Sequence, residues 1–294
     1  MVGLCRGSGG GGGACPRHDE PRCSAGHGGP VVTVRPSVHP VEGSGHPGYG
    51  ASFTRDWWSF AGVMGGVTAG AVLDAVAAEV PPDWRVRTAT FQYLAGVRDD
   101  PLEIAVRTVH QGRSSVVSSV EAASAGRPAL LATVLSAPVD EEQGSFTDVA
   151  MPDVPAPGRC EEVKLPRDLV PVSAQLEFRF ATEARPTVGG DTAELVAWVR
   201  LRTEGRYGPG ELAVISDAMP PALFGIASTP VLMPTADLSL VLGQHPPTSG
   251  FVLVRMRARH LDRAWAVDDC DVWSDDGALL VQSRQSRRLL GPLS

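Results

Sequence analysis

Apolar and polar positions along the first half of the chain predict one buried helix followed by a group of strands. The helix is expected from Gly65 to Val80, where Ala, Val and Leu dominate, and Pro81-Pro82 ends it. Because charged residues are scarce in this segment, the pattern favours a helix that is buried on all sides. Alternating apolar and polar residues, separated by turn residues, then predict strands. These strands are expected at Arg85–Gly96, Leu102–Val109, Ser114–Ala122 and Ala129–Ala137.

The second half of the chain repeats this order, with additional strands in front of its helix. The second helix is expected in the apolar segment from Leu212 to Ala227, and Pro220-Pro221 predicts a break or kink just after Asp217. The strands again follow from alternation and turn residues. They are expected at Ala174–Thr182, Thr192–Arg202, Pro234–Leu242, Phe251–Ala258, Ala266–Trp273 and Ala278–Leu290.

Offsets between matching positions indicate that the two halves are copies of one unit. Thr88 and Thr235 begin the strand after each helix and are 235 − 88 = 147 positions apart. Gly126 and Gly277 lie in the last hairpin of each half, 277 − 126 = 151 positions apart. A near-constant offset is typical of a duplicated unit. The order of elements predicts an α+β fold in which one continuous antiparallel sheet wraps around two central helices.

This pattern also divides the chain into segments. Residues 1–48 hold the run Gly9–Gly13 and little apolar periodicity, so they are expected to form a disordered, low-complexity tail. The first unit is expected at residues 49–139 and the second at 167–294. Residues 140–166 are rich in Pro, Asp and Glu and are interpreted as a linker.

Composition narrows the possible partners and the location. The formal net charge is −7 and no basic stripe is present, which argues against nucleic acid as a partner. No apolar stretch reaches the ~20 residues that span a bilayer, and no signal-peptide pattern begins the chain. Of five cysteines only Cys160 and Cys270 lie outside the tail. The chain is therefore interpreted as a reduced, cytoplasmic protein.

The tail also contains Cys15 and His18, and Cys23 and His27, at spacings that zinc can use. Hydrophobic residues do not surround these side chains, so a low-complexity tail is the favoured interpretation. Neither a metal nor another cofactor is expected.

Asp217 is the first candidate for chemistry. It is the only charged residue between Leu212 and Phe224, and the first copy has Ala71 or Val72 at that place. An unpaired buried carboxylate costs several kcal/mol, so Asp217 must have a partner, be protonated or lie near water. The structural alternative is that Asp217 caps the next helical turn.

Two polar residues could meet Asp217. Thr235 opens the strand after the second helix, and Gln285 lies in the last strand, where the first copy has Val134. A carboxylate, a hydroxyl and an amide can hold one water molecule, with the carboxylate accepting its proton and the other two groups orienting it. Taken singly, Thr at a strand start and Gln on a strand face usually have structural roles.

Three sequence blocks resemble the acyl-CoA thioesterase II-type, double-hotdog thioesterase-like family, and the resemblance covers approximately residues 49–290. They are Gly65-Gly66-Val-Thr-Ala-Gly70 with the segment 107–114, Ile215-Ser216-Asp217 with Thr235-Ala-Asp237-Leu-Ser239, and the segment Gly277–Gln285. The resemblance implies hydrolysis of fatty acyl-CoA to free acid and coenzyme A.

The resemblance also implies roles for particular residues. Asp217, Thr235 and Gln285 match the catalytic residues of the family, and the start of the first helix at Gly65 and Gly66 matches its oxyanion and substrate-binding site. Analogy with the fold suggests a homodimer.

Departures from the family pattern leave two alternatives open. Leu238 stands where many members have His, and Pro220-Pro221 directly after Asp217 is unusual. One alternative is a hotdog module that binds acyl-CoA or a partner without turning it over. The other is an enoyl-CoA hydratase or dehydratase on the same fold, whose chemistry usually needs a His–Asp pair.

Overall fold

The computed structural model describes residues 36–41, 48–139, 144, 146–202, 205–243 and 248–293. The Cys and His pairs of the predicted tail lie outside these residues. Within the predicted tail, residues His39–Val41 form a short strand, β1, which pairs with β2 (Gly48–Ala51).

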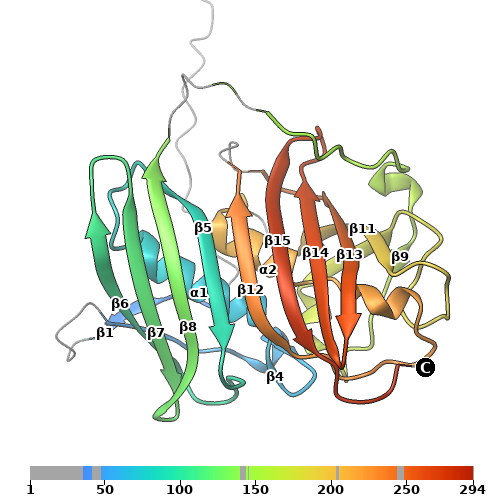
Figure 1. The fold of residues 1–294 in the computed structure, drawn as a ribbon, viewed down its shortest axis with the longest axis horizontal. Helices are drawn as coiled ribbons and strands as arrows, with labels where there is room; N and C mark the ends of the chain where they lie inside the picture. The colour runs from blue at the N-terminus through green and yellow to red at the C-terminus, as the bar shows by residue number, and fades with distance from the viewer. Residues whose placement is uncertain are drawn as a thin grey trace, which may run out of the picture. The chain divides into compact units, whose positions relative to one another are not determined.

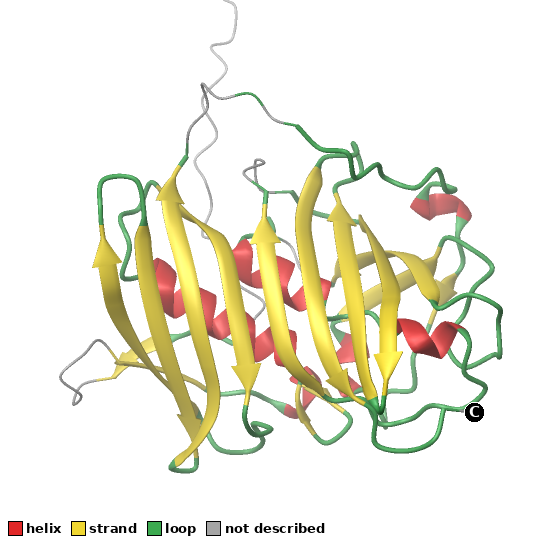
Figure 2. Ribbon diagram, in the orientation of Figure 1, coloured by secondary structure: helices red, strands yellow, loops and turns green. Residues whose placement is uncertain are grey.

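Antiparallel pairing joins thirteen strands of the described residues into one sheet. Figure 1 shows this sheet curving in front of two helices, and Figure 2 separates strands from helices by colour. After β1 and β2, the sheet continues in the order β6 (Leu102–Gln111), β7 (Val116–Ser124), β8 (Arg127–Pro138), β5 (Trp84–Tyr93), β12 (Thr235–Leu242), β15 (Leu279–Arg288), β14 (Trp265–Trp273), β13 (Val252–Asp262), β11 (Glu194–Leu201), β10 (Leu176–Phe180) and β9 (Glu162–Val163). A separate hairpin pairs β3 (Trp58–Ser59) with β4 (Gly62–Val63).

The two helices, α1 (Gly65–Ala77) and α2 (Pro209–Ser216), pack against each other and against the sheet. The first ends three residues before the predicted limit. The second stops at Ser216, at the break expected just after Asp217. It does not resume as an α-helix towards Ala227, because Pro220 and Pro221 lack the amide donors that a continuing helix needs. Short 3-10 turns occupy Arg55–Trp57, Pro157–Arg159, Pro171–Ala174 and Ala222–Gly225.

Strands β5 and β12 join the two halves of the sheet. Five residue pairs link them, from Asp237 opposite Gln92 to Val241 opposite Thr88. One hydrophobic core, which includes Leu73 of α1 and Ile215 of α2, extends through both halves. The sheet therefore holds the helices of both halves in one interior.

A register shift occurs at the same place in both halves, and it shows which residues of the two halves correspond. The β5–β8 pairing shifts between Val86 and Thr88, and the β12–β15 pairing shifts between Thr235 and Asp237. Thr235 therefore corresponds to Val86, an offset of 235 − 86 = 149, and its predicted match with Thr88 was wrong by two residues. The offset is therefore 149 at this strand and 151 at the last hairpin, so a near-constant offset locates the copies without fixing the match to a single residue.

The segment expected to be a linker packs on the second half of the sheet. The indole nitrogen of Trp198 donates to the carbonyl of Pro155 at 2.8 Å, and that of Trp273 donates to the carbonyl of Val149 at 3.4 Å. These contacts cover apolar side chains that would otherwise face solvent. Among the described residues, no helix has the length and apolar character needed to cross a membrane.

Candidate functional site

The N-terminus of α1 meets the C-terminus of α2 at Gly66. A Cβ atom at Gly66 would lie 2.6 Å from the carbonyl oxygen of Ala213 and 2.8 Å from Cβ of Asp217. Only glycine allows the two helix backbones to approach this closely. The approach places the first turn of α1 directly beside Asp217.

Asp217 ends α2, and its side chain is only 7% exposed. The backbone N–H of Gly66 donates to Oδ2 of Asp217 at 2.7 Å, while Nη2 of Arg287 lies 3.8 Å from Oδ1. Burial raises the pKa of Asp217, and the charge of Arg287, the N–H of Gly66 and the side chain of Gln285 oppose that rise. The predicted need for partners is thus met by specific donors.

Thr235 and Gln285 meet on neighbouring strands. The Thr235 hydroxyl donates to Oε1 of Gln285 at 3.0 Å, and the Gln285 amide donates to the carbonyl of Ser216 at 3.4 Å. Gln285 is fully buried. Since Ser216 directly precedes Asp217, the structure brings together all three polar residues expected at the site.

Arg287 was not among the residues expected at the site. Its Nη1 donates to the Thr235 hydroxyl at 3.0 Å, and its Nε donates to Oδ2 of Asp268 at 2.9 Å. A signal was present in the sequence, because Arg287 lies two residues after Gln285 and therefore faces the same side of β15. The strand register places Ser136 of the first half at the corresponding position.

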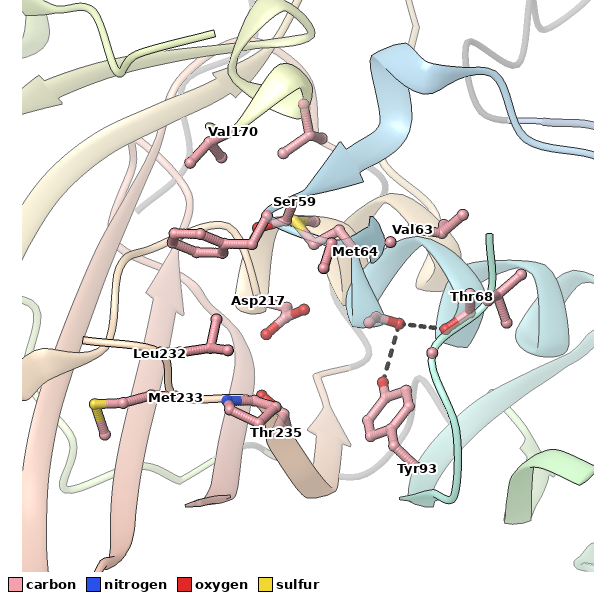
Figure 3. Close-up of a pocket in the computed structure, with 18 of the residues that line it drawn as sticks. Ser59, Val63, Met64, Thr68, Tyr93, Val170, Asp217, Leu232, Met233 and Thr235 are labelled. Carbon is pink, nitrogen blue, oxygen red and sulfur yellow. Dashed lines mark hydrogen bonds between the residues drawn. The ribbon is translucent and has the colours of Figure 1, made fainter. Parts of the chain in front are cut away.

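Tyr93 is a second residue of the site that was not expected from the sequence. Its hydroxyl donates to the carbonyl of Gly65 at 2.9 Å, and the Thr68 hydroxyl donates to the same oxygen at 2.8 Å (Figure 3). Burial, followed by the charge of Asp217, raises the pKa of Tyr93. These bonds fix the first turn of α1, whose Gly66 N–H is engaged with Asp217.

A cavity of about 1070 Å³ opens beside these groups. Asp217, Thr235 and Arg287 form part of its wall, while Gln285 lies behind them. Figure 3 shows Asp217 and Thr235 facing the same space, with Leu232 close by. Much of the remaining wall is apolar, and it includes Phe60, Met64, Phe178, Met219, Phe224 and Met233. The cavity therefore joins a polar cluster to a volume that suits an apolar ligand.

The described residues contain no group of three side chains that could hold a metal ion. Of the cysteines among them, both Cys160 and Cys270 are free thiols.

Solved structures with this fold cover nearly the whole length of the molecule. A hotdog-fold protein of unknown function from Alicyclobacillus acidocaldarius aligns with a TM-score of 0.77 and 22% identity, over 87% of this chain and 96% of that one. A putative thioesterase II from Thermobifida fusca aligns with a TM-score of 0.76 and 20% identity over the same shares. An acyl-CoA thioesterase II from Mycobacterium marinum gives a TM-score of 0.67 and 18% identity, over 86% and 96%.

Family models identify the chain more directly than these structures do. The acyl-CoA thioesterase N-terminal domain matches residues 54–137, and the acyl-CoA thioesterase C-terminal domain matches residues 150–288. No curated protein matches the chain at a significant level. Because the two domain models together match most of the chain, it belongs to the acyl-CoA thioesterase family and is a thioester hydrolase.

Proposed function

We propose that this protein hydrolyses fatty acyl-CoA to free acid and coenzyme A, with Asp217, Thr235 and Gln285 holding the attacking water. The single observation that supports this most is the meeting of Asp217 and Thr235 on the wall of a large, mainly apolar cavity. The acyl chain would occupy the apolar volume, with the thioester carbonyl beside the polar cluster.

The hydrogen bonds of the cluster suggest how the water is oriented. The Thr235 hydroxyl donates its only proton to Gln285 and accepts one from Arg287, which leaves one lone pair. Oδ2 of Asp217 accepts from Gly66, whereas Oδ1 lies 3.8 Å from Nη2 of Arg287. A water donating to Oδ1 and to the free lone pair of Thr235 would present its own lone pair to the thioester carbonyl.

In this mechanism Asp217 is the general base. It removes a proton from the water as the water oxygen bonds to the carbonyl carbon, and the thiolate of coenzyme A leaves when the tetrahedral intermediate collapses. General-base assistance of this kind contributes about 10² to 10⁴-fold. Because the N–H of Gly66 already donates to Asp217, the N-terminus of α1 at Gly65 and Gly66 would act on the developing oxyanion through its positive potential and not through that bond.

A free-thiol release assay across acyl-CoA chain lengths tests the proposal. The unmodified protein should release coenzyme A, and Asp217→Asn should reduce the rate by about 10²-fold or more while the fold persists. An Asp217→Asn protein with full activity would overturn the assignment of Asp217.

A non-catalytic acyl-CoA-binding module and an enoyl-CoA hydratase are the alternatives. Of the two departures that motivated the first, Leu238 is fully buried within β12 and does not line the cavity, whereas Pro220 and Pro221 do. Thermal stabilisation by acyl-CoA without thiol release would favour the binding module. Water addition to an enoyl-CoA would favour the hydratase.

We further propose two hotdog units, at residues 49–139 and 167–294, joined by the linker at 140–166. The separate matches to residues 54–137 and 150–288 and the repeated bulges in β5 and β12 support two units, and the second match begins inside the segment 140–166. We also propose a cytoplasmic enzyme of fatty acid metabolism. It would form a homodimer through an outer edge of its sheet.

A further inference from the structure

Arg287, on the cavity wall, forms a buried ion pair with Asp268, which does not line the cavity. Asp268 is fully buried and Arg287 is 6% exposed. Besides the bonds to Asp268 and Thr235, Arg287 has one nitrogen, Nη2, that finds no hydrogen-bond partner among the described residues. That nitrogen is the one that lies 3.8 Å from Oδ1 of Asp217. The guanidinium therefore connects β14, β12 and the end of α2.

The first half of the sheet shows that the fold does not need this pair. Ser118 pairs with Val134 in β7–β8, as Asp268 pairs with Gln285 in β14–β15, and Ser136 corresponds to Arg287. Both serines are buried in the same kind of sheet. A buried ion pair is weak evidence for stability, since well-packed hydrophobic residues of similar volume often serve a fold as well or better.

We propose that Arg287, held by Asp268, is a positioning residue of the hydrolytic site, which fixes the Thr235 hydroxyl and holds the Asp217 carboxylate for the water. This inference rests on the proposed thioesterase function. A donor from Arg287 forces the Thr235 hydroxyl to direct its proton toward Gln285. The remaining lone pair of Thr235 is then available only as an acceptor for the water.

The charge of Arg287 acts on Asp217 as well. Charged and titratable groups around Asp217 come from several elements: Arg287 on β15, Tyr93 on β5, Asp237 on β12, and Asp268 and Cys270 on β14. Arg287 is the cation among them, and it lowers the pKa of Asp217 against the effect of burial. Without Arg287 the carboxyl would hold its proton to a higher pH and would be lost as a base at that pH.

The test removes both charges together, because removing Arg287 alone would leave Asp268 buried and unpaired. In Asp268→Ser/Arg287→Ser, which copies the first half, we expect a folded protein whose thioesterase kcat falls about tenfold or more. We also expect the acid limb of its kcat–pH profile to move up by about one unit or more. Arg287→Lys keeps the charge, so it should lose kcat through Thr235 while its acid limb stays within about half a unit of the wild-type limb.

Ser118→Ala/Ser136→Ala in the first half is the matched control and should change neither kcat nor the acid limb. A folded Asp268→Ser/Arg287→Ser protein with wild-type kcat and an unmoved limb would overturn the inference. If that variant fails to fold, Arg287→Lys with wild-type kcat would overturn it instead. Full activity of Asp217→Asn would contradict the proposed base itself, so the two failures are distinguishable.

Discussion

The backbone N–H of Gly66 and the carboxylate of Asp217, 151 residues apart in the chain, share a 2.7 Å hydrogen bond. This bond ties the first turn of α1 to the residue that caps the C-terminus of α2. One half of the molecule thus supplies a backbone donor, and the other supplies the acid that it holds. Each half depends on the other for the geometry of the site.

The contact at Gly66 predicts a loss of stability when a methyl group is added there. Gly66→Ala would place Cβ 2.6 Å from the backbone oxygen of Ala213, so the helices must move apart. We expect the free energy of unfolding to fall by about 1–3 kcal/mol, measured by urea denaturation. Gly96→Ala is the matched control, because a Cβ at Gly96 has no atom within 4 Å. Equal stability of the two variants would contradict the close approach.

A second prediction concerns the Thr235 hydroxyl. Thr235→Val removes the acceptor of Arg287 and the donor to Gln285, and Val is also what β5 carries at the corresponding position 86. We expect unfolding to become easier by about 1–3 kcal/mol, because a buried donor loses its partner. Thioesterase kcat should fall as well. Thr235→Ser keeps the hydroxyl and should retain most of the rate, so comparable loss in both variants would refute the role of the hydroxyl.

A third prediction follows from the pKa of Asp217, which burial raises above its usual value. The folded protein therefore binds this proton more tightly than the unfolded chain does. Its contribution to stability is present at low pH and is lost as the pH rises through the folded pKa. At pH 7 the ionised carboxylate therefore opposes folding.

Asp217→Asn should consequently be more stable than the wild type at pH 7, and the difference should shrink toward pH 4. Urea midpoints of both proteins at the two pH values measure this. A stability difference that grows on acidification would show that folding lowers the pKa of Asp217 instead of raising it. An inactive and more stable variant would also separate catalysis from folding at this position.

The role of Tyr93 gives a fourth prediction. Tyr93→Phe removes one of the two hydroxyls that bond to the carbonyl of Gly65 and leaves the Thr68 hydroxyl in place. We expect unfolding to become easier by about 0.5–1.5 kcal/mol and the rate to fall modestly. Thermal denaturation and the thiol-release assay measure the two effects. A rate reduced as far as that of Asp217→Asn would instead place the Tyr93 hydroxyl in direct contact with the reacting groups.

Much of the fold could be predicted from the amino-acid sequence. The order of helices and strands and the break after Asp217 followed from periodicity and from proline, because these depend on local patterns. The apolar segment continues to Ala227, but the α-helix ends at Ser216 and only a 3-10 turn follows. Apolar composition alone does not distinguish these two kinds of backbone. The match of Thr235 with Thr88 failed because the offset between the halves changes by two residues along the chain, and only the strand register shows where.

The site was predictable only where one half differs from the other. Asp217 and Gln285 emerged because their counterparts are apolar. Arg287 and Asp268 differ from Ser136 and Ser118 in charge only, since both counterparts are polar. Their pairing also spans two strands whose register cannot be derived from sequence spacing. Tyr93 gave no signal, because its partner is a backbone carbonyl, which every residue has.

The continuous sheet through β5 and β12 removes a constraint that identical subunits would face. In a symmetric pair every residue appears twice, so a buried acid and its arginine would have to be accommodated at both ends of the interior. A covalent tandem lets the cost of buried charge fall on one half alone. The first half has the uncharged residues Ser118 and Ser136 at the corresponding positions. Substitutions in its part of the cavity wall can therefore accumulate without altering the reacting groups. The residues that select the substrate and the residues that carry out the reaction can thus change independently within one chain.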